Sequence, residues 1–280
     1  MGGIYTILKD GKICEATIRK TAKKVRIVVG DKVQLEKNEY DDGKYIITSL
    51  MERKNIIPRP YIANIDKLLI VIAPSPKPDL LLLDKLIIYC NINNIEPVIV
   101  INKSDLDKDG YINSIVKQYY FIKSFVVSAL NGNNIDTFKN YISNSFCALC
   151  GQSAVGKSSI INSLIPNIDL QTQGLSSKIE RGKHTTRANE IYIYEDIMIS
   201  DTPGFSSLEL DIVYDELAGF YPEFINYIGN CKYLDCSHIK EGKDCAIIKK
   251  VEDGTVSKDR YLRYVDLYEK LKKNWDEKYD

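Results

Sequence analysis

Short apolar runs alternate with amphipathic stretches through the middle of the chain. The apolar runs are Leu68–Ala73, Val98–Ile101, Phe125–Val127, Phe146–Leu149 and Ile197–Ile199. The stretches with helical spacing are Leu80–Asn91, which follows a predicted N-cap at Asp79, Tyr111–Tyr119 and Ile135–Ser143. Buried strands that alternate with helices in this way predict a parallel, doubly wound α/β sheet.

The first fifty residues have a different pattern, with short β segments separated by turn-like stretches. The predicted strands are Ile13–Ile18, Val25–Val29, Lys32–Leu35 and Lys44–Leu50. Short strands at this density fit a small barrel, for which an OB-fold is our first prediction. An SH3-like barrel or a small sandwich stays open. Pro58 and Pro60 mark a predicted linker to the α/β part.

Beyond about Tyr221 the chain changes again, to a cysteine-containing loop region followed by a helix. The helix is predicted within Ser257–Trp275, where one face carries Tyr261, Tyr264, Val265, Tyr268, Leu271 and Trp275. Packing on the neighbouring domain and contact with RNA both remain open for this face. The sequence therefore predicts a multidomain protein, with domains at 1–62, 63–222 and 223–280.

Composition adds two points. The 280 residues carry 38 basic and 38 acidic side chains, but residues 1–62 hold 13 basic and 8 acidic ones, net +5, as a module that binds a polyanion requires. No apolar run approaches a membrane span and no signal peptide is recognisable, so we expect a cytoplasmic protein without a membrane partner. In that compartment, seven cysteines favour free thiols or metal ligands over disulfides.

The first candidate for chemistry is a glycine-rich segment between an apolar strand and the predicted helix Ser159–Ile165. It reads Gly151, Gln152, Ser153, Ala154, Val155, Gly156, Lys157 and Ser158, which fits the phosphate-loop pattern. Backbone N–H groups and the helix N-terminus would cradle phosphates there. Lys157 is expected to reach the β- and γ-phosphates, and the Ser158 hydroxyl to ligate Mg²⁺.

A second segment, Asp201-Thr202-Pro203-Gly204, follows the strand at 197–199. Asp201 is expected to hold Mg²⁺ through its water shell, and the Gly204 N–H to sense the γ-phosphate. Beside a phosphate loop, this segment favours a nucleotide triphosphate switch over an ordinary turn.

The base is predicted to be guanine. Asn102, Lys103, Ser104 and Asp105 follow the apolar strand at 98–101 directly. The Asp105 carboxylate can accept two hydrogen bonds from the N1–H and 2-amino group of guanine, and adenine offers no such pair. An ATPase is therefore disfavoured. Ser128 and Ala129 follow another strand and fit the weaker element whose backbone N–H meets the guanine O6.

Between the phosphate loop and the segment at 201–204 lies a polar stretch that is typical of a switch loop. It reads Arg181-Gly182-Lys183-His184-Thr185-Thr186-Arg187. Thr185 or Thr186 is expected to complete the Mg²⁺ coordination, and the sequence does not choose between them. The position at which related enzymes carry a water-orienting Gln is Phe205, so we expect slow basal hydrolysis. We hypothesise that His184 positions the water; a phosphate or RNA contact is the alternative.

The C-terminal domain contains a metal-ligand pattern. Cys231, Cys236, His238 and Cys245 are spaced as a Cys₃His set, which suits a closed tetrahedral Zn²⁺ site. Because all four positions are filled by protein, a structural role is expected. Small loop-rich segments of this kind often need the metal to fold.

The order of the segments is distinctive, because the guanine reader at 102–105 precedes the phosphate loop at 151–158. A β-barrel, these permuted motifs and a Cys₃His module together resemble the RsgA (YjeQ/YloQ) family over nearly the whole chain. The resemblance implies an OB-fold, a circularly permuted GTPase domain and a zinc-binding C-terminal domain. It also implies nucleotide contacts at Asn102–Asp105 and from Cys150 to Ser158, and a water-positioning role for His184.

The same resemblance implies a cytoplasmic GTPase that takes GTP to GDP and binds the small ribosomal subunit and its rRNA during late maturation, with hydrolysis stimulated by the subunit. We expect a monomer. The alternative is a GTP-gated RNA- or protein-binding module with negligible turnover. We further hypothesise that loss of the γ-phosphate relaxes Gly204 and repositions the zinc module through the segment that follows it.

Overall fold

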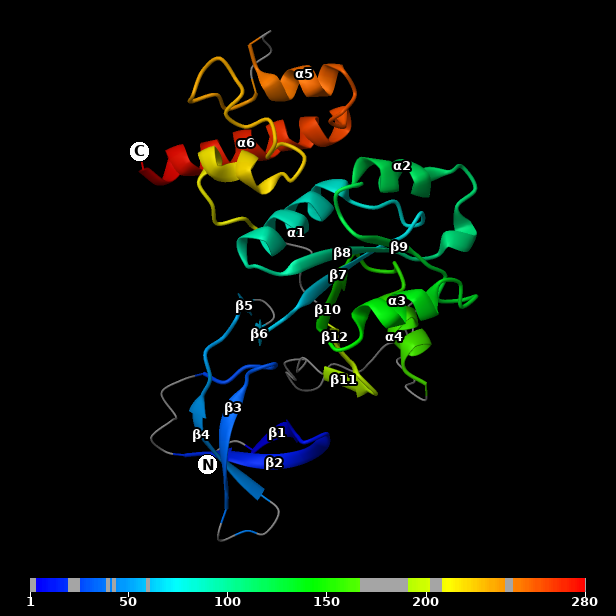
Figure 1. Cartoon of the computed structure of the whole chain (residues 1–280), viewed down its shortest axis with the longest axis vertical. Helices are drawn as coiled ribbons and strands as arrows, with labels where there is room; N and C mark the ends of the chain where they lie inside the picture. The colour runs from blue at the N-terminus through cyan, green and yellow to red at the C-terminus, as the bar shows by residue number, and fades with distance from the viewer. Residues whose placement is uncertain are drawn as a thin grey trace, which may run out of the picture.

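The computed structural model describes residues 4–19, 26–38, 41, 44–58, 61–166, 191–201, 208–239 and 244–279. Figure 1 shows the N-terminal strands at one end of the molecule, a central sheet with helices in the middle, and the C-terminal helices at the other end. The central sheet therefore lies between the two smaller parts.

The N-terminal part is a four-stranded sheet in the order β1-β2-β4-β3, in which β2 and β4 run parallel. Its strands are β1 (Ile4–Lys9), β2 (Lys12–Ile18), β3 (Val33–Lys37) and β4 (Lys44–Leu50). Asp10 and Gly11, at φ 49° and 74°, make the two-residue turn between β1 and β2. Asp-Gly is a pair that such hairpin turns favour because both residues need positive φ.

The prediction of a strand at 25–29 was wrong for the residues that the structure describes. Residues 26–28 have no regular secondary structure, and Val29 forms only an isolated bridge to Ile62. The reason is a turn held by Asp31, whose carboxylate accepts the Val28 N–H (2.7 Å) and pairs with Arg53 (2.7 Å). The apolar run is therefore bent before it can extend a ladder.

The predicted linker at Pro58 and Pro60 was wrong at Pro58, and Pro60 lies outside the described residues. Strand β5 (Ile56–Pro58) pairs with β6 (Tyr61–Ala63) as a hairpin. Ile57 and Ile62 are buried in the same apolar cluster as the central sheet. Prolines are tolerated at the end of a short edge strand, which is why this hairpin can contain one.

The central sheet has six strands in the order β11-β12-β10-β7-β8-β9. The five from β12 to β9 are parallel and β11 is antiparallel. The strands are β7 (Lys67–Ile72), β8 (Glu96–Ile101), β9 (Ser124–Val126), β10 (Phe146–Gly151), β11 (Ile191–Tyr194) and β12 (Ile197–Asp201).

Helices cover both faces of this sheet, so the predicted doubly wound architecture is confirmed. Helices α1 (Leu80–Ile92) and α2 (Tyr111–Gln118) pack in one apolar cluster, and α3 (Ile135–Ile142) and α4 (Lys157–Leu164) in another. Figure 1 shows the two pairs on opposite sides of the strands. The Asp79 side chain caps α1 as predicted, accepting the Leu82 N–H (3.0 Å).

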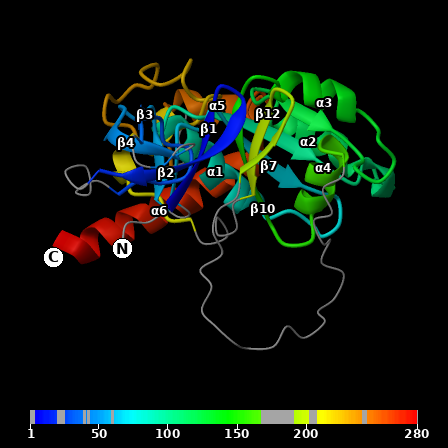
Figure 2. The same cartoon turned by 90° about the horizontal axis from the view of Figure 1, so that it is seen from below.

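The C-terminal part contains the 3-10 helix η4 (Tyr214–Phe220), α5 (Ala246–Glu252) and α6 (Lys258–Tyr279). The tyrosine face of α6 packs inward, where Tyr261, Tyr264 and Tyr268 are buried against Tyr221 and Phe224. Packing is therefore what this face does in the structure. The last turns of α6 extend past the neighbouring elements (Figure 2).

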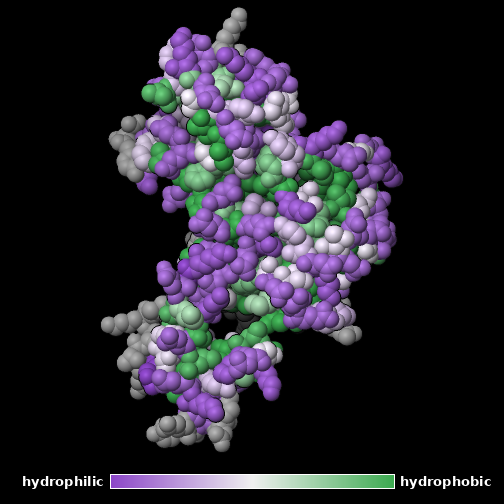
Figure 3. Space-filling model, in the orientation of Figure 1, coloured by the Kyte–Doolittle hydropathy of each residue, from purple (hydrophilic) through white to green (hydrophobic). Residues whose placement is uncertain are grey.

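The apolar clusters cross the predicted domain limits at both ends of the central sheet. Ile57 belongs to the cluster of α1 and α2, whereas Leu217 and Tyr221 belong to the C-terminal cluster. Figure 3 shows a surface that is largely hydrophilic, with hydrophobic residues also visible over the N-terminal sheet. Among the helices in the described ranges, none is long and apolar enough to cross a membrane.

Candidate functional site

The glycine-rich segment 151–158 joins the end of β10 to the start of α4. Gly151, Ala154 and Gly156 all have positive φ, at 137°, 65° and 95°. A Cβ on Gly151 would lie 2.2 Å from the Val71 oxygen. The segment can wrap closely only because glycine stands at this contact, as a phosphate loop before a helix N-terminus requires.

Lys157 closes over its own loop. Its Nζ donates to the carbonyl oxygens of Gly151 (3.0 Å) and Gln152 (2.9 Å). Burial lowers the pKa of Lys157, and the negative charge of Asp201 opposes that shift. The ammonium is thus held by carbonyl oxygens of the loop, and a phosphate there would be a stronger acceptor than either carbonyl.

Asn102 ties three segments of the site together. Its side chain is buried, and its Nδ2 donates to the Val155 oxygen (3.0 Å) while its Oδ1 accepts the Ala129 N–H (3.1 Å). A Cβ on Gly156 would lie 2.3 Å from the same Nδ2. The structure therefore brings the predicted guanine reader, the Ser128-Ala129 element and the phosphate loop into one place.

Asp105 presents an exposed carboxylate beside this junction. The Ser128 hydroxyl donates a hydrogen bond to Asp105 Oδ1 (2.5 Å), and Ser128 itself is fully buried. This hydrogen bond fixes the carboxylate, as two-point recognition of a base requires. Lys103 has a positive φ of 59°. Its Nζ donates hydrogen bonds to the main-chain oxygens of Ala154 (2.7 Å) and Ser75 (3.1 Å), so its side chain also borders the site.

Asp201 ends β12, which pairs with β10 in parallel. Its carboxylate and the phosphate loop therefore lie at the same carboxyl edge of the sheet, where ligands bind in such folds. Ser158 is half-buried in the first turn of α4. The other predicted residues, His184, Thr185, Thr186 and Gly204, lie outside the described residues.

Cys150 begins the segment that is predicted to contact the nucleotide, and its thiol is buried beneath that segment. The residue is fully buried in the cluster that contains Cys90, and burial raises the pKa of its thiol. All seven cysteines are free thiols, as the sequence led us to expect.

One part of the site was missed by sequence reasoning. The segment 73–79 follows β7 and borders the phosphate loop, because the Gln152 Oε1 accepts the Asp79 N–H (3.0 Å) and Lys103 reaches Ser75. Its signal was present: three prolines directly follow an apolar strand at the edge where the motifs gather. Prolines at such a position restrict a loop beside the site.

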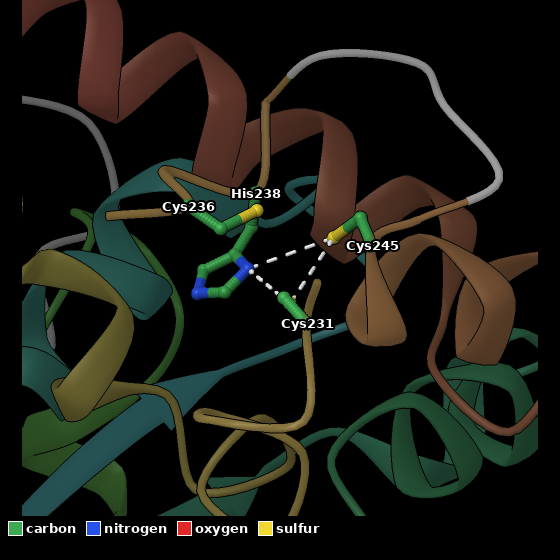
Figure 4. Close-up of side chains that lie close together, drawn as sticks. All are labelled: Cys231, Cys236, His238 and Cys245. Atoms are coloured by element: carbon green, nitrogen blue, oxygen red, sulfur yellow. Dashed lines mark hydrogen bonds between the residues drawn. The ribbon is translucent and has the colours of Figure 1, made fainter. Parts of the chain in front are cut away.

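The Cys₃His residues converge as predicted, although they come from a loop and the start of a helix (Figure 4). Their ligand atoms all lie within 4.8 Å of one another. His238 Nδ1 lies 3.4 Å from the Cys231 sulfur and 3.6 Å from the Cys245 sulfur, which are 3.9 Å apart. A tetrahedral zinc site has S···S edges of about 3.8 Å and S···N edges of about 3.5 Å.

The chemistry of this cluster also suits a metal. Burial raises the pKa of the Cys245 thiol to about 12, and the neighbouring Cys231 and Cys236 act in the same direction. Burial lowers the pKa of His238, which keeps its Nδ1 free to act as a ligand. Three sulfurs that disfavour one another's charge need a cation between them, so the residues present fit Zn²⁺.

A model of the RsgA GTPase family matches residues 50–211, more than half of the chain. The chain belongs to the RsgA GTPase family. The match spans both the predicted guanine reader and the phosphate loop, so the resemblance that the motifs suggested is confirmed.

Relatives of this RsgA-family chain align over nearly its whole length. "Small ribosomal subunit biogenesis GTPase RsgA" of Caldanaerobacter subterraneus subsp. tengcongensis is 36% identical over 286 residues, covering 100% of this chain and 96% of that protein. The protein of the same name from Malacoplasma penetrans is 37% identical over 267 residues, covering 92% and 91%.

Two solved structures are similar to it. YjeQ from Thermotoga maritima superposes with a TM-score of 0.82 at 28% identity, covering 96% of this chain and 94% of that one. YloQ, described as a circularly permuted GTPase, gives a TM-score of 0.80 at 27% identity, covering 97% and 92%. The RsgA-family chain thus has the circularly permuted GTPase fold, with a sheet-rich N-terminal part.

Proposed function

We propose that this RsgA-family protein hydrolyses GTP to GDP and phosphate while bound to the small ribosomal subunit, during late maturation of that subunit. The single observation that carries the proposal is Asn102, whose side chain joins the guanine reader, the Ala129 N–H and the phosphate loop at one edge of the sheet. The names of the relatives supply the biological setting.

Within this proposal, Asp105 reads the base and the loop from Gly151 to Ser158 holds the phosphates. Asp105 pairs with the N1–H and 2-amino group of guanine, and the Ala129 N–H meets its O6. Lys157 leaves the carbonyls of its loop for the β- and γ-phosphates. Ser158 and Asp201, with Thr185 or Thr186, would hold Mg²⁺, which neutralises charge on the phosphates.

Hydrolysis needs a group that orients water, and Phe205 cannot do so. His184 is the residue that we assign to this role, in the segment expected to order around the γ-phosphate. An imidazole accepts and donates hydrogen bonds, so it can align a water molecule once its loop is held by a partner. Slow turnover alone and faster turnover on the subunit follow from this assignment.

The C-terminal module would hold Zn²⁺ through Cys231, Cys236, His238 and Cys245. The distances among their ligand atoms support this assignment. With four protein ligands the ion has no open position, so it would fold the loop and take no part in hydrolysis.

The N-terminal sheet would bind rRNA as an OB-fold. Its order β1-β2-β4-β3, with one parallel pair, is the order of the last four strands of a five-stranded OB barrel. The surplus of basic residues in 1–62 favours the phosphate backbone of a nucleic acid. The proposal includes a monomer that works in the cytoplasm.

The test is a turnover assay with zinc-loaded protein and GTP alone, with small subunits, with large subunits and with bare rRNA. We expect slow turnover alone and a large stimulation by small subunits only. Equal turnover in all four samples contradicts the proposal and favours a GTP-gated binding module, for which Phe205 is the sequence argument.

A further inference from the structure

Gln152 of the phosphate loop accepts hydrogen bonds from two different parts of the chain. Its main-chain carbonyl accepts a hydrogen bond from Lys157 Nζ (2.9 Å), and its side-chain Oε1 accepts the N–H of Asp79 (3.0 Å), the N-cap residue of α1. A phosphate at the loop draws Lys157 away from that carbonyl. Occupation of the site therefore acts directly on the residue that holds the start of α1.

Helix α1 lies between the central sheet and the C-terminal part (Figure 1). Leu83 and Leu86 pack in the cluster of the sheet, whereas Ile88 packs in the C-terminal cluster. A helix that is apolar on several sides is held by both neighbours. Because packed interiors are rigid, a displacement at one end of α1 is passed to whatever the helix contacts.

One of the contacts of α1 with the C-terminal part is ionic and buried. Asp84 of α1 is fully buried and pairs with Arg260 and with Arg263 (2.5 Å) of α6. Arg260 also pairs with Glu223, and its guanidinium lies over the rings of Tyr119 and Tyr221, at 4.9 Å and 4.8 Å. A fully buried charge cannot leave its partner for water, so α6 must follow Asp84.

Helix α6 in turn holds the candidate zinc loop. The hydroxyl of Tyr261 donates to the His238 oxygen (2.9 Å), and that of Tyr264 donates to the Ser237 oxygen (2.7 Å). Tyr261 directly follows Arg260 in the sequence. The loop with the metal ligands is thus anchored to the same turns of α6 that grip α1.

We propose that Gln152, α1 and the Asp84–Arg260–Arg263 cluster connect the nucleotide site to the zinc module. Nucleotide binding moves Lys157 off the Gln152 carbonyl, the start of α1 shifts with the Gln152 side chain, and Asp84 carries α6 and its loop along. The inference rests on the proposed function. It differs from a route through the segment after Asp201, because Gln152, α1 and α6 all lie outside that segment.

The chain contains its own reporter. Trp275 is its only tryptophan, lies on α6 and packs edge-on against Tyr214 at 6.3 Å between ring centroids. With zinc-loaded full-length protein, we expect its emission to shift between saturating GDP and a non-hydrolysable GTP analogue. The equilibrium zinc affinity, measured by competition with a chelator, should differ between the two states by about fivefold or more.

Arg263→Gln tests the connection away from the nucleotide, and Lys270→Gln is its matched control. Both remove one positive charge from α6, but Lys270 is exposed. We expect Arg263→Gln to bind both nucleotides and lose both responses, and Lys270→Gln to keep them. Gln152→Ala, read at saturating nucleotide, should lose them as well. If Arg263→Gln fails to fold, Arg263→Lys takes its place, with reduced responses expected.

Two results overturn the connection. One is a wild-type protein that binds both nucleotides by calorimetry but shows the same Trp275 emission and zinc affinity in each state. The other is a folded Arg263 variant that keeps the wild-type responses, which would assign the coupling to the segment after Asp201. Failure to bind any guanine nucleotide is a different result, since it overturns the proposed function itself.

Discussion

At the scale of single residues, the account depends on how side chains are held as much as on which side chains are present. Asp105 is exposed, so its direction is set by the one hydroxyl that reaches it, that of Ser128. A carboxylate free to rotate would lose part of the orientation that recognition of a base needs. Ser128 is thus a positioning residue for Asp105.

We predict that Ser128→Ala weakens GDP binding by about five- to tenfold, because one hydrogen bond to the carboxylate is lost. Calorimetry with GDP measures the effect. Ser114→Ala is the control, since its hydroxyl also donates a hydrogen bond, to the Tyr111 oxygen (2.7 Å), but at an exposed position of α2. GDP affinity unchanged in Ser128→Ala would show that Asp105 is held by other means.

Gly156→Ala is expected to damage the junction at Asn102. The new methyl group would lie 2.3 Å from Asn102 Nδ2, at a residue with φ 95°. Gly132→Ala is the control for the cost of positive φ, which is about 1–2 kcal/mol. Gly132 also has a positive φ, 75°, but a Cβ added there would meet no other atom within 4 Å. We expect GDP affinity to fall at least tenfold more in Gly156→Ala. Equal affinities would contradict the role of Asn102.

Individual site residues were predictable to the extent that local sequence carries their chemistry. Asp105, Lys157 and the four Cys₃His residues stand in short patterns whose spacing reflects geometry. The bond between Ser128 and Asp105 and the contact between Gln152 and Asp79 join distant segments, so no local pattern encodes them.

At the scale of elements, the hydrophobic pattern predicted helices and strands well where an element buries one face or is buried on all sides. The five parallel strands of the central sheet and α1 were predicted within a few residues of their observed bounds, whereas the antiparallel edge strand β11 was missed. The run at 25–29 failed because a side chain, Asp31, competes for the backbone N–H of Val28. This competition depends on the ion pair between Asp31 and Arg53, which lies 22 positions later in the sequence.

The C-terminal loop is the element that we expect to depend on metal. Removing zinc with a strong chelator should unfold the segment around 231–245, because few apolar residues hold it and metal binding supplies its folding free energy. Trp275 emission and a thermal melt report the change. We expect Cys236→Ser to resemble the chelated protein.

Cys14→Ser is the matched control for that substitution, since Cys14 lies on β2, away from the cluster. It should melt as the wild type does in the presence of zinc. A chelated wild type with an unaltered melt and emission would contradict a structural role for the metal.

At the scale of the whole molecule, the central sheet that carries the candidate nucleotide site lies between two smaller parts (Figure 1). The family model and the similar solved structures support the circular permutation, which the order of the motifs had indicated. The OB-fold stays a prediction, which came from the density of short strands in the first fifty residues. Sequence could not give how tightly the C-terminal part is joined, because the Asp84 cluster unites residues more than 170 positions apart.

The measurement that tests the central claim most directly is nucleotide preference in Asp105→Asn. A carboxylate matches the two N–H donors of guanine, whereas an amide also offers an N–H to the second carbonyl of xanthine. We predict that the wild type binds GDP and not ADP, and that Asp105→Asn loses GDP and gains the xanthine diphosphate. Undiminished GDP binding by Asp105→Asn, or equal binding of GDP and ADP by the wild type, would contradict the account.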